Sequence, residues 1–335
     1  MYKKVLLLLT VLLCAAPSWA SSVSGTLVWT FDLSAQEQGK PVDLWIPYPL
    51  SDAQQTISNV RYGGSFAQAA VYADRVNRTP MLHVHWDAEQ KQRKLEFSFD
   101  VERDEVIHHQ LPAVEPIWNP GDYALYLAPT SLGPLDGRVG ELAGQIVAGK
   151  KSVLEKARAV YDWTVENTYR DPATRGCGKG DVCTLLDKPG GKCADISSVF
   201  VALARAAGVP TREVFGIRQG KKDGQDVSGW QHCWAEFFMP GYGWVAVDPA
   251  DVRKLMLKEQ VALDSARGKA LREYFWGGVD PYRVRLSEGR DLQLSPVQQG
   301  GPVNYLMYPF AQVGGKTLDW LDPKGFQYTI RYRKG

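Results

Sequence analysis

The sequence predicts an α+β protein in which strands come first, helices follow and a β-hairpin comes after them. Alternating apolar and polar residues recur between residues 21 and 115, as they do in half-buried strands. Apolar residues with helical spacing follow between 138 and 207. Two aromatic-rich runs then flank Pro240-Gly241, which is typical of a hairpin. This order of helices and then strands favours an antiparallel sheet with a helix packed against it.

Length and composition exclude several classes of function. The chain has 335 residues, 44% of them hydrophobic and 23% charged, which supports a sizeable core and more than one domain. Its 39 basic and 37 acidic residues give a formal net charge of +2. This balance offers no argument for nucleic acid as a partner. The sequence contains no Walker loop, Rossmann glycine pattern or EF-hand loop, and we expect no cofactor and no metal.

Residues 1–20 have the pattern of a secretory signal peptide. Two lysines form a positive start, an apolar run follows, and Ser18-Trp19-Ala20 fits a small-x-small cleavage site. The apolar run is short for a membrane span, although a retained anchor is the alternative. Cys14 would suggest a lipoprotein, but Leu13 precedes it where a small residue is expected. We expect a bacterial protein that is periplasmic or extracellular, with no integral membrane segment after cleavage.

Residues 21–115 predict an N-terminal β-sandwich-like domain. Its clearest strands are 26–31, 42–46 and 95–101, with turn residues between them. His83 and His85 share one face of a further strand. Two histidines at this spacing could bind a metal, but they more often lie on the solvated face of a half-buried strand. The proline-rich segment 111–121 marks the end of the domain.

Three helices are predicted after this boundary. The first covers 138–147, and the second begins with a capping box at Ser152–Glu155. The third begins near Cys193 and ends before Gly208-Val209-Pro210. Cys193 thus lies at a helix N-terminus, where unpaired N–H groups and the helix dipole favour a thiolate. The preceding Gly190-Gly191 allows a substrate or another backbone to approach closely. These features suit a nucleophile, and the alternative is a small buried cysteine at a helix cap.

The predicted hairpin carries a candidate base and a partner for it. A pairing centred on Pro240 places Phe238 opposite Tyr242, Glu236 opposite Trp244 and His232 opposite Asp248. Directly opposed residues have Cβ atoms about 5 Å apart, so His232 and Asp248 can hydrogen-bond. Cys233 then points to the other face, as a core residue would. An exposed polar pair is the alternative, and a bulge in the turn would change the register.

Three motifs together resemble the transglutaminase-like superfamily, within the wider papain-like class of thiol enzymes. They are Gly-Gly-Lys-Cys-Ala-Asp at 190–195, His-Cys-Trp-Ala-Glu at 232–236 and Gly-Trp-Val-Ala-Val-Asp-Pro at 243–249. Their order and spacing are more specific than any one motif, and the resemblance covers roughly residues 120–250. It implies that Cys193 is the nucleophile, His232 the base and Asp248 the residue that orients the imidazole.

The resemblance also implies the fold of the core, α+β and transglutaminase-like (papain-like), to which the strand pattern of residues 21–115 adds an N-terminal β-sandwich domain. The expected organisation is a signal peptide at 1–20, a β-sandwich-like domain at 21–115, a catalytic core at 118–255 and a C-terminal extension with short strands at 256–335. Five aromatic residues of this extension could line a substrate groove but are more often core residues: Trp276, Tyr282, Tyr305, Tyr308 and Trp320.

Cleavage of the signal peptide would leave four cysteines. In an oxidising compartment we expect Cys177 and Cys183 to form a disulfide, because the glycine-rich loop between them lets its ends meet. Cys193 and Cys233 then stay free. The alternative is a zinc site of Cys177, Cys183 and His232, although no Cys-x-x-Cys pair supports it.

The predicted function is cysteine-dependent acyl chemistry on peptide or protein amides. Cys193 would attack the carbonyl and His232 would protonate the leaving group. The backbone N–H of Cys193 is one expected oxyanion donor, and Tyr169 or Gln231 is the second. The acyl-enzyme could react with water, as in a protease or amidase, or with an amine, as in transglutaminase crosslinking, and hydrolysis is favoured. The alternative is a non-catalytic module on the same fold that binds a peptide or a cell-wall polymer.

Overall fold

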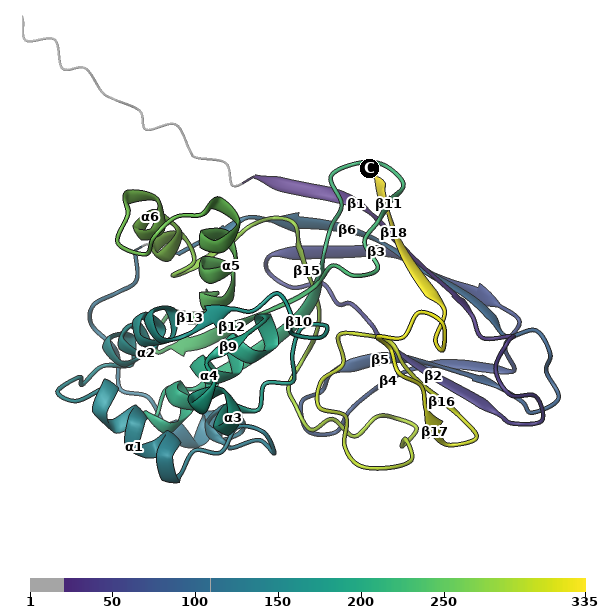
Figure 1. Cartoon of the computed structure of the whole chain (residues 1–335), viewed down its shortest axis with the longest axis horizontal. Helices are drawn as coiled ribbons and strands as arrows, with labels where there is room; N and C mark the ends of the chain where they lie inside the picture. The colour runs from purple at the N-terminus through teal and green to yellow at the C-terminus, as the bar shows by residue number, and fades with distance from the viewer. Residues whose placement is uncertain (1–20, 109) are drawn as a thin grey trace, which may run out of the picture.

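The computed structural model describes residues 21–108 and 110–335, so the expected signal peptide lies outside the described residues. A β-sandwich forms one side of the molecule and a helix-covered sheet forms the other (Figure 1). Over the described ranges, no helix has both the length and the apolar character needed to cross a bilayer.

The sandwich is built from two five-stranded sheets. Its N-terminal strands are β1 (Ser22–Asp32), β2 (Val42–Pro47), β3 (Gln55–Gly64), β4 (Gln68–Ala73), β5 (Pro80–Trp86) and β6 (Lys94–Asp104). One sheet has the order β11-β18-β1-β6-β3 and the other β17-β16-β2-β5-β4. Alternation along β1 directs Leu27, Trp29 and Phe31 into the space between the sheets, where each is at most 1% exposed.

Strands from later in the chain complete both sheets of this sandwich. They are β11 (Gln225–Asp226), β16 (Phe310–Val313), β17 (Lys316–Thr317) and β18 (Tyr328–Lys334). β18 pairs antiparallel with β1, with Ile330 opposite Trp29, and β16 pairs antiparallel with β2. Part of the expected C-terminal extension is therefore continuous with the N-terminal domain in space.

The second half of the fold is a four-stranded antiparallel sheet covered by helices. Its order is β13 (Gly243–Val247), β12 (Gln231–Met239), β10 (Thr211–Arg218) and β15 (Arg283–Glu288). The helices are α1 (Gly137–Ile146), α2 (Val153–Asn167), α3 (Val182–Asp187), α4 (Cys193–Ala206), α5 (Pro249–Glu259) and α6 (Ala266–Tyr274). Short elements connect them: β7 (Val106–Ile107), the 3-10 helix η1 (Pro120–Leu127), β8 (Tyr169–Arg170), β9 (Gly190–Gly191) and β14 (Gly278–Val279).

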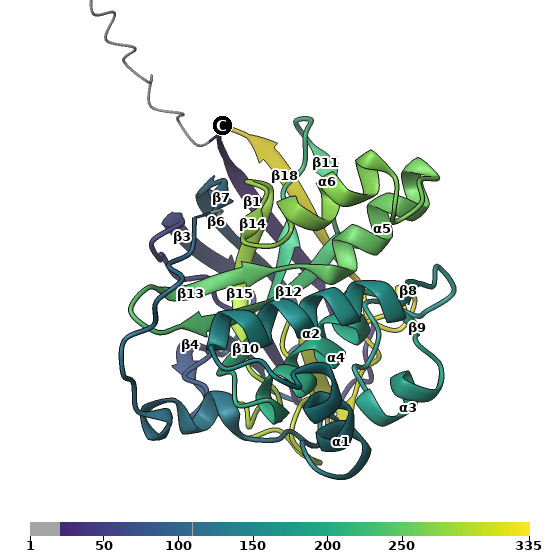
Figure 2. The same cartoon turned by 90° about the vertical axis from the view of Figure 1, so that its left-hand side faces the viewer.

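Helix α4 is the centre of this half. It packs on β10 and β12 while α1, α2 and α5 cover its other sides (Figure 2). Its apolar residues Val199, Phe200 and Leu203 are at most 1% exposed, and burial of each such side chain stabilises the fold by about 2 kcal/mol. The predicted capping box of Ser152 and Glu155 begins α2. The α+β core with a β-sandwich is thus the architecture that the sequence predicts.

The hairpin register differs from the predicted one. Ala235 pairs with Val247 and Phe238 with Trp244, so the pairing is centred on Gly241 and not on Pro240. Pro240 and Gly241 form the middle of a turn closed by a 3.0 Å bond from the Tyr242 N–H to the Met239 carbonyl. One further residue, Tyr242, follows before Gly243, with φ of 116°, pairs with Met239. The predicted direct opposition of Phe238 with Tyr242, of Glu236 with Trp244 and of His232 with Asp248 is therefore wrong.

Candidate active site

Cys193 is the first residue of α4, and the backbone around it is fixed by Asp195. The Asp195 carboxylate accepts hydrogen bonds from the N–H groups of Lys192 at 3.1 Å and Gly180 at 2.8 Å. The N–H of Ala194 donates to the Cys177 carbonyl at 2.9 Å. The Cys193 N–H has no hydrogen-bond partner within the described residues. The nucleophile candidate therefore has an unused backbone donor beside its own thiol.

Glycines let the preceding loop close around Asp195. Gly178 has φ of 91°, and a Cβ there would lie 1.9 Å from an Asp195 carboxylate oxygen. A Cβ on Gly191 would lie 2.4 Å from the Asp195 Cβ. The close approach that the sequence suggested is thus made by the Asp195 side chain. It brings Cys177 next to Cys193.

His232 and Asp248 are in direct contact although their strands do not align them. His232 lies on β12, and its Nε2 is 2.7 Å from Asp248 Oδ2. Asp248 follows β13 as the N-cap of α5, and its Oδ1 accepts the Asp251 N–H at 2.8 Å. The register shift of two residues preserves strand alternation, so both side chains remain on one face. The second imidazole nitrogen, Nδ1, is left for another partner.

The surroundings of the Cys193 thiol and the His232 imidazole favour the charged form of each group. Hydrogen bonds from the thiols of Cys177 and Cys233, together with the nearby His232 imidazole, hold the pKa of Cys193 well below its ordinary value. Burial alone would lower the pKa of His232, but the carboxylates of Asp251 and Asp248 outweigh burial and raise it. Both shifts favour a thiolate next to an imidazolium.

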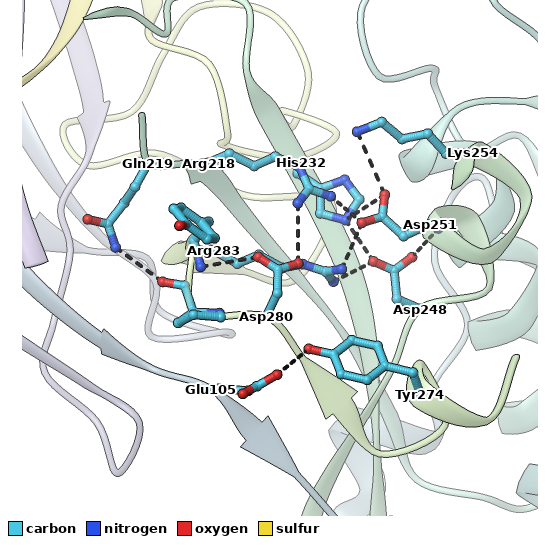
Figure 3. A network of polar contacts seen from close by, with 12 residues as sticks. Glu105, Arg218, Gln219, His232, Asp248, Asp251, Lys254, Tyr274, Asp280 and Arg283 are labelled. Atoms are coloured by element: carbon cyan, nitrogen blue, oxygen red, sulfur yellow. Dashed lines mark hydrogen bonds and ion pairs between the residues drawn. The ribbon is translucent and has the colours of Figure 1, made fainter. Parts of the chain in front are cut away.

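A buried charge network supports the His232–Asp248 pair (Figure 3). The Arg283 guanidinium donates to Asp248 at 2.5 Å and to Asp251 at 2.7 Å. Arg218 also bonds to Asp251, and Asp280 accepts from Arg283 at 2.8 Å. No sequence pattern predicted a role for these residues. Asp251 follows Asp248 at helical spacing, but Arg283 lies on β15 and carries no local signal.

The predicted Cys177–Cys183 disulfide is wrong, because all four described cysteines are free. Cys177 is buried, its thiol accepts a hydrogen bond from the Tyr308 hydroxyl at 3.2 Å, and its Sγ lies 3.5 Å from the Gln231 carbonyl oxygen. Cys183 is exposed on α3. The loop between them wraps around Asp195, which turns Cys177 toward Cys193. The alternative zinc site of Cys177, Cys183 and His232 lacks Cys183 for the same reason, because Cys183 is exposed whereas Cys177 is buried.

Cys233 is fully buried, as expected of a core residue, but its side chain also reaches Cys193. His232, Asp248 and Asp251 offer ligand atoms within 4.8 Å of one another, which is a possible metal-binding set by residue type. Arg283 bonds to Oδ2 of Asp248 and of Asp251, and Arg218 bonds to the same Oδ2 of Asp251, whereas Asp251 Oδ1 accepts no hydrogen bond within the described residues. The positive charges of the two arginines already compensate these carboxylates, which disfavours a cation there.

A cavity of about 370 Å³ opens beside Cys193 and His232. Gln231 also lines it, is 7% exposed, and has no hydrogen-bond partner on either side-chain amide atom. Tyr169, the other suggested oxyanion donor, lines an adjacent groove of about 920 Å³ and not this cavity. The C-terminal segment contributes several lining residues, of which four are aromatic: Tyr308, Trp320, Phe326 and Tyr328.

Two of the five C-terminal aromatic residues thus line the candidate site. They are Tyr308 and Trp320, and Trp320 also borders the adjacent groove. Trp276 instead stacks on Phe237 in the core. Tyr305 is buried and donates to the Gly178 carbonyl at 2.7 Å. The sequence could not separate the two groups, since both are aromatic residues in weakly patterned segments.

Comparison with known proteins identifies the family. The sequence profile of the Transglutaminase-like superfamily matches residues 140–249, which contain Cys193, His232 and Asp248. The chain belongs to the transglutaminase-like superfamily. An uncharacterized protein of Haemophilus influenzae is 35% identical over 332 residues, covering 91% of this chain and 90% of that protein.

Two further proteins match less of the chain or match it at low identity. A protein-glutamine gamma-glutamyltransferase of Pseudomonas aeruginosa is 36% identical over 87 residues, which cover 24% of this chain and 13% of that protein. The crystal structure of a candidate cysteine protease from Cytophaga hutchinsonii has a TM-score of 0.55 at 15% identity, covering 94% of this chain and 99% of that chain. The latter similarity shows that the two chains share a fold over nearly their whole length.

Proposed function

We propose that this protein is a thiol enzyme that cleaves peptide or protein amides through Cys193, His232 and Asp248. The observation that carries the proposal is the 2.7 Å contact between His232 Nε2 and Asp248 Oδ2 in the wall of the cavity that also contains Cys193. This contact fixes the imidazole and leaves Nδ1 for the thiol. The lowered pKa of Cys193 and the raised pKa of His232 support the same assignment.

In the first step the Cys193 thiolate attacks the amide carbonyl carbon. A C–S bond forms and the carbonyl oxygen becomes an oxyanion. The Cys193 N–H and the Gln231 side-chain amide are the proposed donors to that oxygen, because neither has another partner within the described chain. The His232 imidazolium then gives its proton to the leaving nitrogen as the C–N bond breaks, which leaves a thioester on Cys193.

In the second step water attacks the thioester and His232 accepts its proton. The C–S bond breaks, a carboxylic acid is released and the thiolate is restored. An amine in place of water would give a crosslink, which is the reaction in the name of the Pseudomonas relative. We propose hydrolysis as the main outcome and keep crosslinking as an alternative outcome of the test.

The proposal is tested with peptides whose amines have been blocked by dimethylation. Hydrolysis then creates new free amines, and a fluorescent primary amine added to the mixture records crosslinking. Acid quenching followed by mass spectrometry detects the thioester on Cys193. We expect new amines with the natural chain and none with Cys193→Ala. If neither product nor adduct forms while the chain still retains peptides, the protein is a binding module and the proposal fails.

We also propose that the protein is exported to the periplasm or beyond, on the pattern of residues 1–20. Fractionation of cells that produce the full chain tests this. We expect the processed protein outside the cytoplasm, and a full-length cytoplasmic protein would contradict export.

A further inference from the structure

We propose that the Cys193 cavity selects an acyl substrate that carries a carboxylate close to the scissile carbonyl. The inference rests on the proposed function and deepens it by naming a substrate class. The cavity is lined by three cationic side chains, Arg170, Lys192 and Lys254. No aspartate or glutamate of the described residues lines it. A small cavity with three cations and no lining carboxylate attracts an anion.

The three cations come from separate elements that line the same cavity as the thiol. Arg170 lies on β8 and pairs with Gly191, two residues before Cys193. Lys192 directly precedes Cys193 as the N-cap of α4. Lys254 lies on α5, one turn after Asp251. Because each position is fixed by a different element, the cluster is a feature of the assembled site and not a run of basic sequence.

Carboxylates of the protein neutralise little of the positive charge of these three side chains. Arg170 and Lys192 are half-buried, and neither makes a side-chain ion pair within the described residues. Lys254 Nζ is 3.8 Å from Asp251, a carboxylate already bonded to Arg283 at 2.7 Å. In contrast, the half-buried Arg212 pairs with two carboxylates elsewhere on the sheet. An anionic ligand would supply the partner that the cavity lacks.

Aromatic residues that line the same cavity indicate which group of the substrate lies next to the carboxylate. Trp320, Phe326 and Tyr328 present aromatic surface from the C-terminal segment. An acyl chain can pack there while its carboxylate faces the cations. The site thus fits a peptide with a carboxylate and an apolar stem on the acyl side of the cleaved bond.

The cations could instead serve only to stabilise the thiolate, and two alkylating reagents separate these roles. Iodoacetate and iodoacetamide both form a C–S bond to the thiolate as the C–I bond breaks and iodide leaves. They differ in one negative charge. A change in thiolate fraction alters both rates equally, so their ratio measures attraction of the anion alone. Labelling is read at Cys193 by peptide mass spectrometry, with 2-mercaptoethanol as the reference thiol.

We compare the rate constant for labelling by iodoacetate with that for labelling by iodoacetamide. At low salt we expect this ratio of rate constants to be about tenfold higher at Cys193 than for 2-mercaptoethanol, because the nearby cations attract the anion. It should fall by about threefold in each of Arg170→Gln and Lys254→Gln, and toward the reference value at high salt. Lys258→Gln is the matched control, because Lys258 is exposed one turn further along α5 and does not line the cavity. Its ratio should equal that of the natural chain.

Three isosteric compounds identify the position of the carboxylate. N-acetylglutamine carries it at the terminus, N-acetylglutamate α-amide carries it on the side chain, and N-acetylglutaminamide has none. We expect one or both acids to protect Cys193 from iodoacetamide at a concentration where the diamide does not. Equal protection by all three, or by none, overturns the substrate class.

The two proposals fail in different ways. A ratio equal to that of 2-mercaptoethanol, together with rapid iodoacetamide labelling of Cys193, overturns the carboxylate site and leaves the nucleophile standing. Slow iodoacetamide labelling of Cys193 at every pH below its ordinary pKa overturns the proposed function, and the substrate class falls with it.

Discussion

Asp248 bonds to His232 from the N-terminus of α5 and not from the strand that precedes that helix. One carboxylate therefore has two tasks. Its Oδ2 lies 2.7 Å from the imidazole Nε2, and its Oδ1 accepts the first-turn N–H of Asp251 at 2.8 Å. The orientation of the imidazole is thus coupled to the position at which a helix begins.

Asp248→Asn tests the orienting role. Asparagine can still cap α5, but it removes the negative charge beside His232 and Arg283. We expect kcat to fall by up to about 10⁴, by analogy with other triads, with some activity left above that of Cys193→Ala. The free energy of unfolding, measured by thermal unfolding, should fall by about 3 kcal/mol, because Arg283 loses one buried partner. Activity within tenfold of the natural chain would contradict the role.

Arg283→Leu tests whether the buried network holds the site together. Arg283 is fully buried and bonds to Asp248, Asp251 and Asp280. Its removal leaves buried carboxylates without their cation. We therefore expect the free energy of unfolding, measured with denaturant, to fall by about 3–5 kcal/mol. Arg285→Leu on the same strand is the control, since Arg285 is partly exposed, and it should cost about 1 kcal/mol or less. Equal losses in the two variants would exclude a special role for the network.

Substitutions of Cys193 and Cys233 test which cysteine is the nucleophile and which one stabilises the fold. Cys193→Ala should abolish turnover and cost about 1 kcal/mol or less, because it removes one small group at a helix start. Cys233→Ser places a hydroxyl in a fully buried position and should cost about 1–3 kcal/mol, with turnover retained in the folded fraction. Melting curves and turnover of both variants check this. A stable but inactive Cys233→Ser with an active Cys193→Ala would mean that the nucleophile is Cys233.

Gln231→Ala tests the second oxyanion donor. The Gln231 amide has no partner within the described chain, so its loss should cost little stability. Loss of an oxyanion donor should lower kcat by about 10²–10³ with little change in KM. Steady-state kinetics of the folded variant decide the matter. A change confined to KM would instead make Gln231 a substrate-binding residue.

The sequence predicted the features that depend on local pattern. Helix α4, the capping box of α2 and the existence of the hairpin follow from residues that are near one another in the chain. It also predicted that Cys193, His232 and Asp248 come together, because the three motifs resemble a family whose fold brings them together. Family membership and the α+β fold are confirmed, whereas the catalytic roles remain predictions.

Features that depend on distant contacts were not predictable. The pairing of β18 with β1 joins the two ends of the chain, and neither strand carries a mark of its partner. Arg283 is an ordinary basic residue in a strand until the fold places it against Asp248. The Cys177–Cys183 disulfide was predicted from loop flexibility, but the loop is held by Asp195 and directs the Cys177 thiol inward. The predicted register was wrong because the turn is centred on Gly241, with Tyr242 as a further unpaired residue before Gly243.

The pH dependence of Cys193 alkylation tests the central claim most directly. The pKa of Cys193 is lowered, so the thiolate should persist as the pH falls below the ordinary value of 9.0. The pKa of His232 is raised, so the imidazolium should be lost only as the pH rises through that higher value. Turnover should therefore be highest between these two titrations.

Iodoacetamide labelling of Cys193 should show a midpoint well below 9.0 in the native protein, and the midpoint should move upward in His232→Ala and in the urea-unfolded chain. Circular dichroism of His232→Ala establishes that the variant is folded. A native midpoint equal to that of the unfolded chain, and unchanged in folded His232→Ala, would contradict a Cys193–His232 thiolate–imidazolium pair.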